Sequence, residues 1–240
     1  MKRILLIVIL FSSLSIYAQS TRQYLGLTVG PSFPLSDFAK TDLSDSTSGF
    51  AKTGVNFKFL YSYRITHNFG IQAHFVYNSN FFDREALTSE VEKNIPDYSF
   101  SVESNQPWGN GGAYVGPFLS FLITENFSWD FRVLIGFTGG FSPQYIIRGT
   151  NLDSGEKTEY YREAAKSYGF GAVGGTGFKY RIKRYLILLN ADYYYSNLNF
   201  KEITGWGWTS PDNPTGTPYV ISRKQKTNTF AVTIGFAYFL

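Results

Sequence analysis

The sequence VNFKFLYSY at residues 55–63 alternates between two kinds of side chain. Its odd-numbered positions hold one Val, two Phe and two Tyr, and three of the four positions between them hold Asn56, Lys58 and Ser62. Side chains two residues apart lie on the same face of a β-strand. The stretch therefore predicts a strand with one strongly apolar face.

The same alternation recurs along the chain. It is clear again at residues 69–77, 127–137, 185–195 and 229–240, and it is weaker around residues 25–29, 115–121 and 170–180. With residues 55–63 this makes eight stretches, each about as long as a strand that crosses a membrane. The sequence therefore predicts eight strands, each with one apolar face.

The connections between these stretches also alternate in length. Long polar segments cover residues 32–50, 79–112, 138–167 and 197–226, and short ones cover 64–68, 122–126 and 181–184. A soluble sandwich has no reason to place all its short turns at one end, whereas membrane barrels have short periplasmic turns and long external loops. We therefore expect an all-β fold, an eight-stranded antiparallel up-and-down transmembrane β-barrel with both termini in the periplasm.

Composition excludes several classes of protein. The 240 residues include 23 Phe, 18 Tyr and 4 Trp, only 17% are charged, and there is no Cys. Many aromatic and few charged residues exclude a disordered chain, and the lack of Cys excludes disulfide scaffolds and thiolate metal sites. A net charge of +4 is too small to suggest nucleic acid as a partner. A membrane-embedded β protein and a secreted β-rich binding or enzymatic domain remain.

The N-terminus predicts secretion. Lys2 and Arg3 precede an apolar run at residues 4–11, and Ala18 precedes Gln19. This is the pattern of a secretory signal, and it is too short for a spanning helix. We expect residues 1–18 to be a signal peptide and residues 19–240 to be an integral outer-membrane barrel with four long extracellular loops.

The C-terminus carries the most specific resemblance. Its last eight residues, TIGFAYFL, place Thr233, Gly235, Tyr238 and Leu240 as in the signal read by the outer-membrane insertion machinery. The chain resembles the small outer-membrane β-barrels of Gram-negative bacteria, of the OmpA/OmpX-like and PorT types. These barrels usually end in Phe or Trp, so Leu240 departs from the pattern. The resemblance implies outer-membrane lipid, lipopolysaccharide and the insertion machinery as partners.

A set of polar residues falls on the strand face opposite the apolar one. An eight-stranded barrel has an interior just wide enough for side chains to fill, and charges buried there must be paired. We expect an ion-paired plug that fixes the shape of the barrel, with a gate or a narrow proton or ion path as the functional alternative. The set is Lys58, His74, Asp130, Arg132, Lys179, Asn190 and Asp192.

Two motifs suggest chemistry, and the chain departs from both. GFGAVG at residues 169–174 matches the dinucleotide fingerprint, but strand-like sequence follows where the mechanism needs a helix N-terminus. We expect these glycines to make room for neighbours or to let the sheet bend. Residues 194–197 resemble the His-x-Ser-Asn stretch of barrel lipid A deacylases, but Tyr194 replaces the His. We assign no catalytic residue, cofactor or metal.

The long segments carry whatever binding specificity exists. Segment 79–112 is acidic, with a short helix expected at 83–94, and segment 197–226 is basic and holds Trp206 and Trp208. Opposite charges predict that these loops pack on one another above the barrel. We expect a monomeric, non-enzymatic barrel with a structural role or loop-mediated binding of an extracellular ligand or envelope protein. Alternatives are transport of small hydrophobic molecules, an accessory role in a PorT-type secretion or gliding machine and, less favoured, a lipid A-modifying enzyme.

Overall fold

Eight strands of the chain close into a barrel in the computed structural model, which describes residues 22–209 and 216–240. The predicted signal peptide lies outside the described residues. Every strand pairs antiparallel with its neighbours, and β12 pairs with both β10 and β1, which closes the ring. The predicted eight-stranded antiparallel barrel is confirmed. Its strands are β1 (Gln23–Pro34), β2 (Ala51–Arg64), β3 (Phe69–Phe82), β5 (Trp108–Leu122), β6 (Phe127–Ser142), β9 (Ala165–Ile182), β10 (Tyr185–Thr209) and β12 (Thr229–Phe239).

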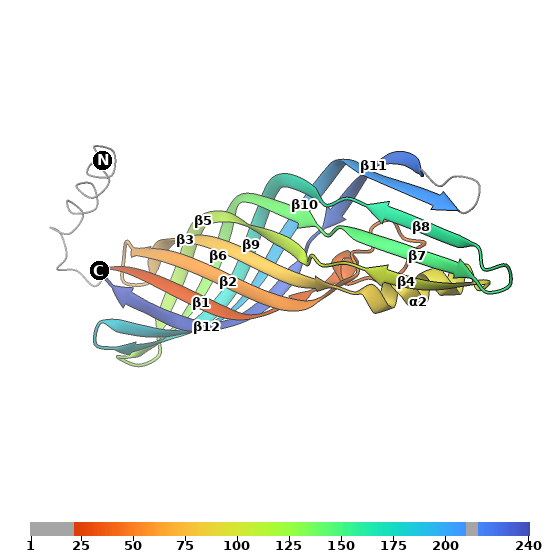
Figure 1. Cartoon of the computed structure of the whole chain (residues 1–240). Helices are drawn as coiled ribbons and strands as arrows, with labels where there is room; N and C mark the ends of the chain where they lie inside the picture. The colour runs from red at the N-terminus through yellow and green to blue at the C-terminus, as the bar shows by residue number, and fades with distance from the viewer. Residues whose placement is uncertain (1–21, 210–215) are drawn as a thin grey trace, which may run out of the picture.

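The short connections lie together at one end of the barrel, here called the short-turn end (Figure 1). They join β2 to β3, β5 to β6 and β9 to β10. The end of the chain is at the same place, because the backbone N–H of Leu240 donates to the carbonyl of Gln23 at 3.0 Å. The start of β1 and the end of β12 therefore both lie at the short-turn end.

The two strand faces differ sharply in exposure. Phe57 is 54% exposed on the outside of β2, and its neighbour Lys58 is 1% exposed inside. The outer face is apolar on every barrel strand, because the apolar side chains of each strand are two residues apart and so point to the same face. Outward-facing examples are Leu27, Phe57, Phe75, Val115, Ile135, Phe170, Leu189 and Phe236.

Buried side chains fill the lumen in layers. At the short-turn end lies an apolar cluster of Tyr24, Leu60, Leu186, Leu188, Ala237 and Phe239. Polar residues follow, and beyond them lies a second cluster of Val76, Tyr114, Leu134, Val173, Tyr194 and Ala231. A third closes the opposite mouth with Phe38, Ala51, Trp108, Leu198, Phe200 and Ile203. Buried polar residues also continue toward this mouth, where Asn56, Asn78 and Asn110 are joined by hydrogen bonds.

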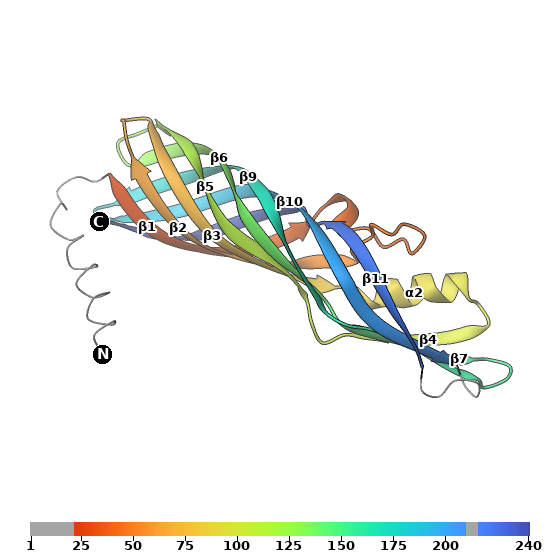
Figure 2. The same cartoon turned by 90° about the horizontal axis from the view of Figure 1, so that it is seen from above.

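The long segments differ from the loops we expected, because three of them contribute strands to a second sheet, here called the cap sheet. Its order is β11–β10–β8–β7–β4, with the outer part of β10 running on from the barrel wall. The cap sheet projects beyond the mouth opposite the short-turn end (Figures 1 and 2). Pairing satisfies backbone groups that irregular loops would leave to water. Its other strands are β4 (Tyr98–Glu103), β7 (Tyr145–Asn151), β8 (Lys157–Arg162) and β11 (Thr217–Lys226).

The helix expected at residues 83–94 is present as α2 (Arg84–Asn94). The side chain of Asp83 caps it by accepting from the N–H of Ala86 at 2.9 Å. Leu87 and Val91 are buried against one face of the cap sheet. A short 3-10 helix, η2 (Ser36–Phe38), lies in the first long segment. Among the described residues, no helix is long and apolar enough to cross a membrane.

The oppositely charged segments meet above the barrel through apolar rather than charged side chains, since Trp108 packs against Phe200 with ring centres 5.9 Å apart. β4, from the acidic segment, and β11, from the basic one, lie at opposite edges of the cap sheet. β7 and β8, from the third long segment, lie between β4 and β10. Backbone pairing rather than charge attraction therefore assembles the cap.

Candidate functional site

A three-residue ion cluster lies at the centre of the barrel. Lys58 Nζ is 2.5 Å from Asp192 Oδ2, and Arg132 Nε is 2.6 Å from Asp192 Oδ1. The three side chains come from β2, β6 and β10 and are almost wholly buried. One carboxylate therefore holds two cations from opposite parts of the ring.

A second nitrogen of Arg132 is also hydrogen-bonded. Its Nη2 donates to the carbonyl of Thr176 and to Asn190 Oδ1, both at 2.9 Å. Charge-assisted bonds of this kind are short and directional, so they fix the side chain in place. Of the seven predicted lumen residues, four thus meet in one group: Lys58, Arg132, Asn190 and Asp192.

Two more predicted residues form a separate pair nearer the short-turn end. Lys179 Nζ lies 2.7 Å from Asp130 Oδ2 and 3.3 Å from Ser120 Oγ. The same ammonium lies over the rings of Tyr24 and Phe118, at 5.3 and 5.4 Å from their centres. A ring face attracts a cation, so the lysine is held from several sides.

The seventh predicted residue, His74, stands apart from the ion pairs. It is buried in the lumen, and its Nε2 lies 3.2 Å from Gln72 Oε1. Gln72 in turn donates to the hydroxyl of Tyr24 at 3.1 Å. The imidazole therefore belongs to a hydrogen-bonded chain whose other members are the uncharged side chains of Gln72 and Tyr24.

The glycine run of β9 makes room for the ion cluster. A Cβ at Gly175 would lie 1.9 Å from Asp192 Oδ1, and one at Gly177 would lie 2.5 Å from Asn190 Oδ1. The segment continues as β-strand to Ile182, so no helix begins after the glycines. Of the fingerprint glycines, Gly171 is closely packed, since a Cβ there would lie 2.8 Å from the carbonyl of Tyr195, whereas a Cβ at Gly174 would meet nothing within 4 Å.

Among residues 22–209 and 216–240, the side chain of Ser196 is hydrogen-bonded to another hydroxyl and to no base. Its hydroxyl lies 2.5 Å from the hydroxyl of Thr227, on the inner face of β10. The two histidines of the chain, His67 and His74, are on the β2–β3 hairpin. A serine nucleophile needs a base within hydrogen-bond reach. The arrangement gives Ser196 no such partner.

The predicted C-terminal signal residues divide between the two faces of β12. Tyr238 and Leu240 are on the outer face at the short-turn end, and Thr233 is buried inside. Gly235 also faces inward, where a Cβ would lie 1.9 Å from the carbonyl of Leu27. The alternation predicted for the last strand is therefore present in the fold.

The outer face of the cap sheet presents aromatic and charged side chains. Trp206 stacks on Tyr161 with ring centres 5.7 Å apart. Arg148 bridges Glu103 and Glu159, each at 2.6 Å. A groove of about 410 Å³ runs beside them, lined by Ser99, Ser101, Arg148, Thr150, Lys157, Glu159 and Trp208. In the sequence, only Trp206 and Trp208 indicated a binding surface in this part of the chain.

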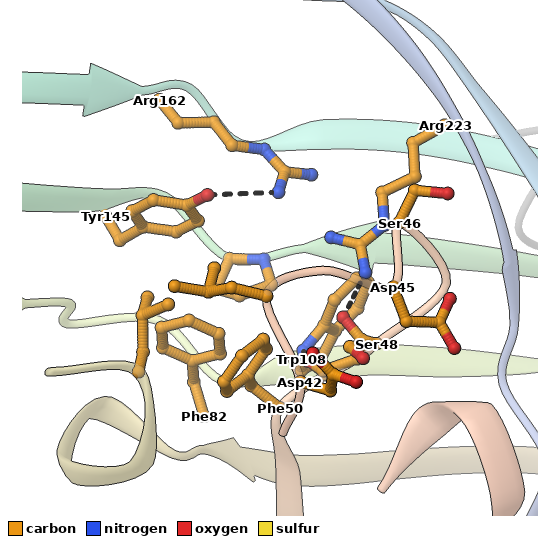
Figure 3. Close-up of a pocket in the computed structure, with 14 residues that line it drawn as sticks. Asp42, Asp45, Ser46, Ser48, Phe50, Phe82, Trp108, Tyr145, Arg162 and Arg223 are labelled. Atoms are coloured by element: carbon orange, nitrogen blue, oxygen red, sulfur yellow. Dashed lines mark hydrogen bonds between the residues drawn. The ribbon is translucent and has the colours of Figure 1, made fainter. Parts of the chain in front are cut away.

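A smaller pocket lies on the opposite face of the cap sheet, above the barrel mouth (Figure 3). Its volume is about 100 Å³. Phe50, Phe82 and Trp108 form its apolar side, and Arg162 and Arg223 reach it from the cap. Nothing in the sequence paired these two arginines, because they lie in different long segments.

A third hollow, of about 760 Å³, lies along the outer wall of the barrel between apolar side chains of β1, β2, β3 and β12. The wall beneath it is hydrogen-bonded, with β1 paired to β2 from Gln23 to Ser32. Its outward lining includes Leu27, Phe57, Phe59, Phe75, Tyr77, Ile234 and Phe236.

Comparison with solved structures finds small outer-membrane proteins. Ail, the attachment invasion locus protein of Yersinia pestis, aligns over 90% of this chain and 99% of its own, with 13% identity and a TM-score of 0.42. Neisserial surface protein A aligns over 92% and 98%, with 10% identity and a TM-score of 0.39. OprG of Pseudomonas aeruginosa aligns over 90% and 95%, with 11% identity and a TM-score of 0.41. No protein-family model and no curated protein matches the chain.

Proposed function

We propose that the chain is an integral outer-membrane barrel that carries an extracellular binding surface. The filled lumen makes the barrel a rigid support for that surface. The apolar belt of the barrel supports the membrane location. Ile135, Phe170 and Phe236 are each more than half exposed, with many similar neighbours. Water-soluble monomers rarely expose contiguous apolar patches larger than a few hundred Å². Lipid, including lipopolysaccharide in the outer leaflet, is the environment that suits this belt.

The orientation follows from the lengths of the connections. Membrane barrels keep short turns in the periplasm and long segments outside. The short-turn end, with both ends of the mature chain, then faces the periplasm, and the cap sheet is extracellular. A closed ring leaves no free strand edge in the membrane, which favours a monomer.

The lumen cluster is proposed as a structural plug. Asp192 ties three strands together, and apolar layers lie on both sides of it. Removing one partner of a buried ion pair leaves an uncompensated charge, which costs about 3–5 kcal/mol. A proton or ion path would need a polar route through the whole lumen, and apolar clusters occupy part of its length.

The last residues of β12 are proposed as the segment read by the insertion machinery. Tyr238 and Leu240 present an apolar edge at the short-turn end, where a periplasmic factor would meet the chain. Arg184 Nη1 donates to the hydroxyl of Tyr238 at 3.4 Å across the closing strand pair. The same residues thus complete the rim of the finished barrel.

The groove on the outer face of the cap sheet carries the binding proposal. Trp, Tyr and Arg are the residues that contribute most at binding interfaces, and here they are fixed on strands rather than on loops. Trp208 and Arg148 line the groove directly. A sheet face with pre-positioned aromatic side chains loses little conformational entropy on binding. We propose a non-enzymatic role, since the side chain of Ser196 is hydrogen-bonded to another hydroxyl.

Site-specific photocrosslinking in native membranes tests the binding role. A photoreactive residue at Ser101, inside the groove, should give a discrete crosslinked species, and Trp208→Ala should abolish it. The matched control places the same residue at Asp153, in the exposed turn after β7. Equal crosslinks from both positions, or none from Ser101, would contradict the proposal. A large envelope protein in the adduct would indicate the accessory role in a secretion or gliding machine.

The continuous wall of the barrel argues against the alternative function, transport of small hydrophobic molecules. The large outer hollow faces lipid, and the strand pairing beneath it is continuous between β1 and β2. A lateral route needs an opening between paired strands. The hollow is instead an apolar surface that suits contact with lipid acyl chains.

A further inference from the structure

Two arginines of the cap sheet converge on the pocket above the barrel mouth. Arg162 ends β8, and Arg223 lies on β11, on the same face of the sheet. Arg162 is only 3% exposed, and Arg223 is half-buried. Figure 3 shows both guanidinium groups directed toward the same space from different sides.

Neither guanidinium has its hydrogen-bonding capacity filled. Arg223 donates one Nη2 bond to the carbonyl of Ser48, and Arg162 Nη1 reaches the hydroxyl of Tyr145 at a long 3.4 Å. Arg162 Nε, Arg162 Nη2 and Arg223 Nε are buried and without a partner. Buried donors left unpaired are rare and costly, which makes three in one place informative.

Within residues 22–209 and 216–240, neither arginine has a carboxylate oxygen within 4 Å of its nitrogens. Asp45, which lines the pocket, bonds Lys40 at 2.6 Å and Thr47 at 2.8 Å instead. Burial, together with the neighbouring charge of Arg162, lowers the pKa of Arg223 to about 10. The pocket lining thus holds two arginines and two aspartates, and Asp45 acts on Arg223 only through its charge at longer range, without pairing with it.

Asp42 also lines the pocket, and its carboxylate is engaged elsewhere. Its Oδ1 accepts from the N–H and the hydroxyl of Ser44, at 2.8 and 2.7 Å. The hydroxyl of Ser48, by contrast, is buried in the lining and has no partner. The free groups around this cavity of about 100 Å³ are thus donors from Arg162, Arg223 and Ser48.

We propose that this pocket binds a tetrahedral oxyanion, a phosphate or sulfate group held between the two guanidiniums and the Ser48 hydroxyl. A carboxylate has two coplanar oxygens and matches the fork of a single arginine. A phosphate or sulfate has oxygens in several directions and meets donors that arrive from different sides. The proposal rests on the extracellular binding role of the cap and names the chemistry of one ligand.

The direct test is titration of the full-length protein in phosphatidylcholine nanodiscs. Inorganic phosphate and sulfate, at an ionic strength held constant with sodium chloride, should bind saturably by calorimetry and raise the unfolding temperature. Arg162→Gln and Arg223→Gln should each weaken binding at least ten-fold, about 1.4 kcal/mol. The control Arg84→Gln, at an exposed arginine that begins α2 outside the pocket, should change affinity less than two-fold.

A second readout separates ligand binding from a purely structural role. Without phosphate, Arg162→Gln should not lower the unfolding temperature, because it removes an unpaired buried charge. In saturating phosphate the wild type should unfold at a higher temperature than the variant. Ser48→Ala, which keeps both charges, should bind phosphate more weakly than the wild type. Destabilisation by Arg162→Gln in both conditions, or no protection beyond that of chloride, would overturn the proposal.

The lipid composition of the nanodiscs distinguishes two possible sources of the anion, a membrane lipid and a soluble ester. Nanodiscs containing phosphatidic acid, a phosphate monoester, should stabilise the protein without added phosphate if the group belongs to a membrane lipid. If it belongs to a soluble ester, only free phosphate or sulfate should do so. Crosslinking from Ser101 reads the opposite face of the sheet, so failure of the anion site and failure of the groove are distinguishable.

Discussion

Asp192 and Lys58 are 134 residues apart in the chain, and their side chains meet at 2.5 Å in the middle of the barrel. Two further strands, β1 and β12, lie between their strands in the ring. The pair therefore crosses the lumen rather than joining neighbours. Because Asp192 also binds Arg132, one carboxylate fixes the spacing of three strands.

Replacing Asp192 with Asn should destabilise the barrel strongly. Lys58 and Arg132 would remain buried without an anion, and we expect a loss of about 3–5 kcal/mol in the free energy of unfolding. Urea unfolding in lipid vesicles, followed by heat-modifiable gel mobility, measures it. Asp153→Asn, on an exposed turn, is the control and should change little. Equal losses in the free energy of unfolding for Asp192→Asn and Asp153→Asn would mean that water reaches the ion cluster.

The filled lumen predicts that the purified barrel conducts poorly. The side chains that point into the lumen are buried, and apolar clusters occupy part of its length. In planar bilayers the protein should not form stable porin-like channels. Steady large conductance steps from homogeneous protein would contradict the plug.

Adjacent glycines on β9 offer a matched test of packing around Asp192. A Cβ at Gly175 would lie 1.9 Å from Asp192 Oδ1, whereas one at Gly174 would meet nothing within 4 Å. Gly175→Ala should therefore cost about 1–3 kcal/mol through overpacking, and Gly174→Ala should cost much less. The comparison uses the same unfolding assay, and similar losses would show that the lumen has space to spare.

The final strand predicts an assembly defect. Removing residues 238–240 takes away the outward Tyr238 and Leu240 and the buried Phe239. The shortened chain should accumulate in the periplasm in a protease-sensitive form, while Leu240→Phe should assemble normally. Surface proteolysis of cells expressing each form measures this. Normal assembly of the shortened chain would show that the insertion signal lies elsewhere.

Local pattern was enough to predict the barrel strands and their faces. Phe57 and Lys58 illustrate why: their directions follow from alternation alone, once one face must be apolar. The lumen set was predicted in the same way. Which of its members meet was not predictable, because Lys58 and Asp192 are joined by barrel closure and strand stagger, which no short stretch encodes.

The cap sheet was not predicted, since its pairings have no local signal. β10 continues without a break from the barrel into residues that read as a polar loop, and Gly205 there pairs with Arg162 of another segment. β4 (YSFSVE) alternates over only six residues, and β8 (KTEYYR) does not alternate. The convergence of Arg162 and Arg223 depends on that long-range register, so their shared pocket emerges only from the fold.

A charge scan across the boundary of the belt tests the central claim most directly. Ile234 on β12 and Val220 on β11 are similarly exposed, at 58% and 64%, but only Ile234 lies on the barrel wall. In lipid vesicles, Ile234→Lys should lower the free energy of unfolding by about 2–4 kcal/mol because its charge would face hydrocarbon. Val220→Lys should lower it by less than about 0.5 kcal/mol, as at an ordinary water-exposed site. Equal small losses at both positions would contradict a membrane-embedded barrel with an extracellular cap.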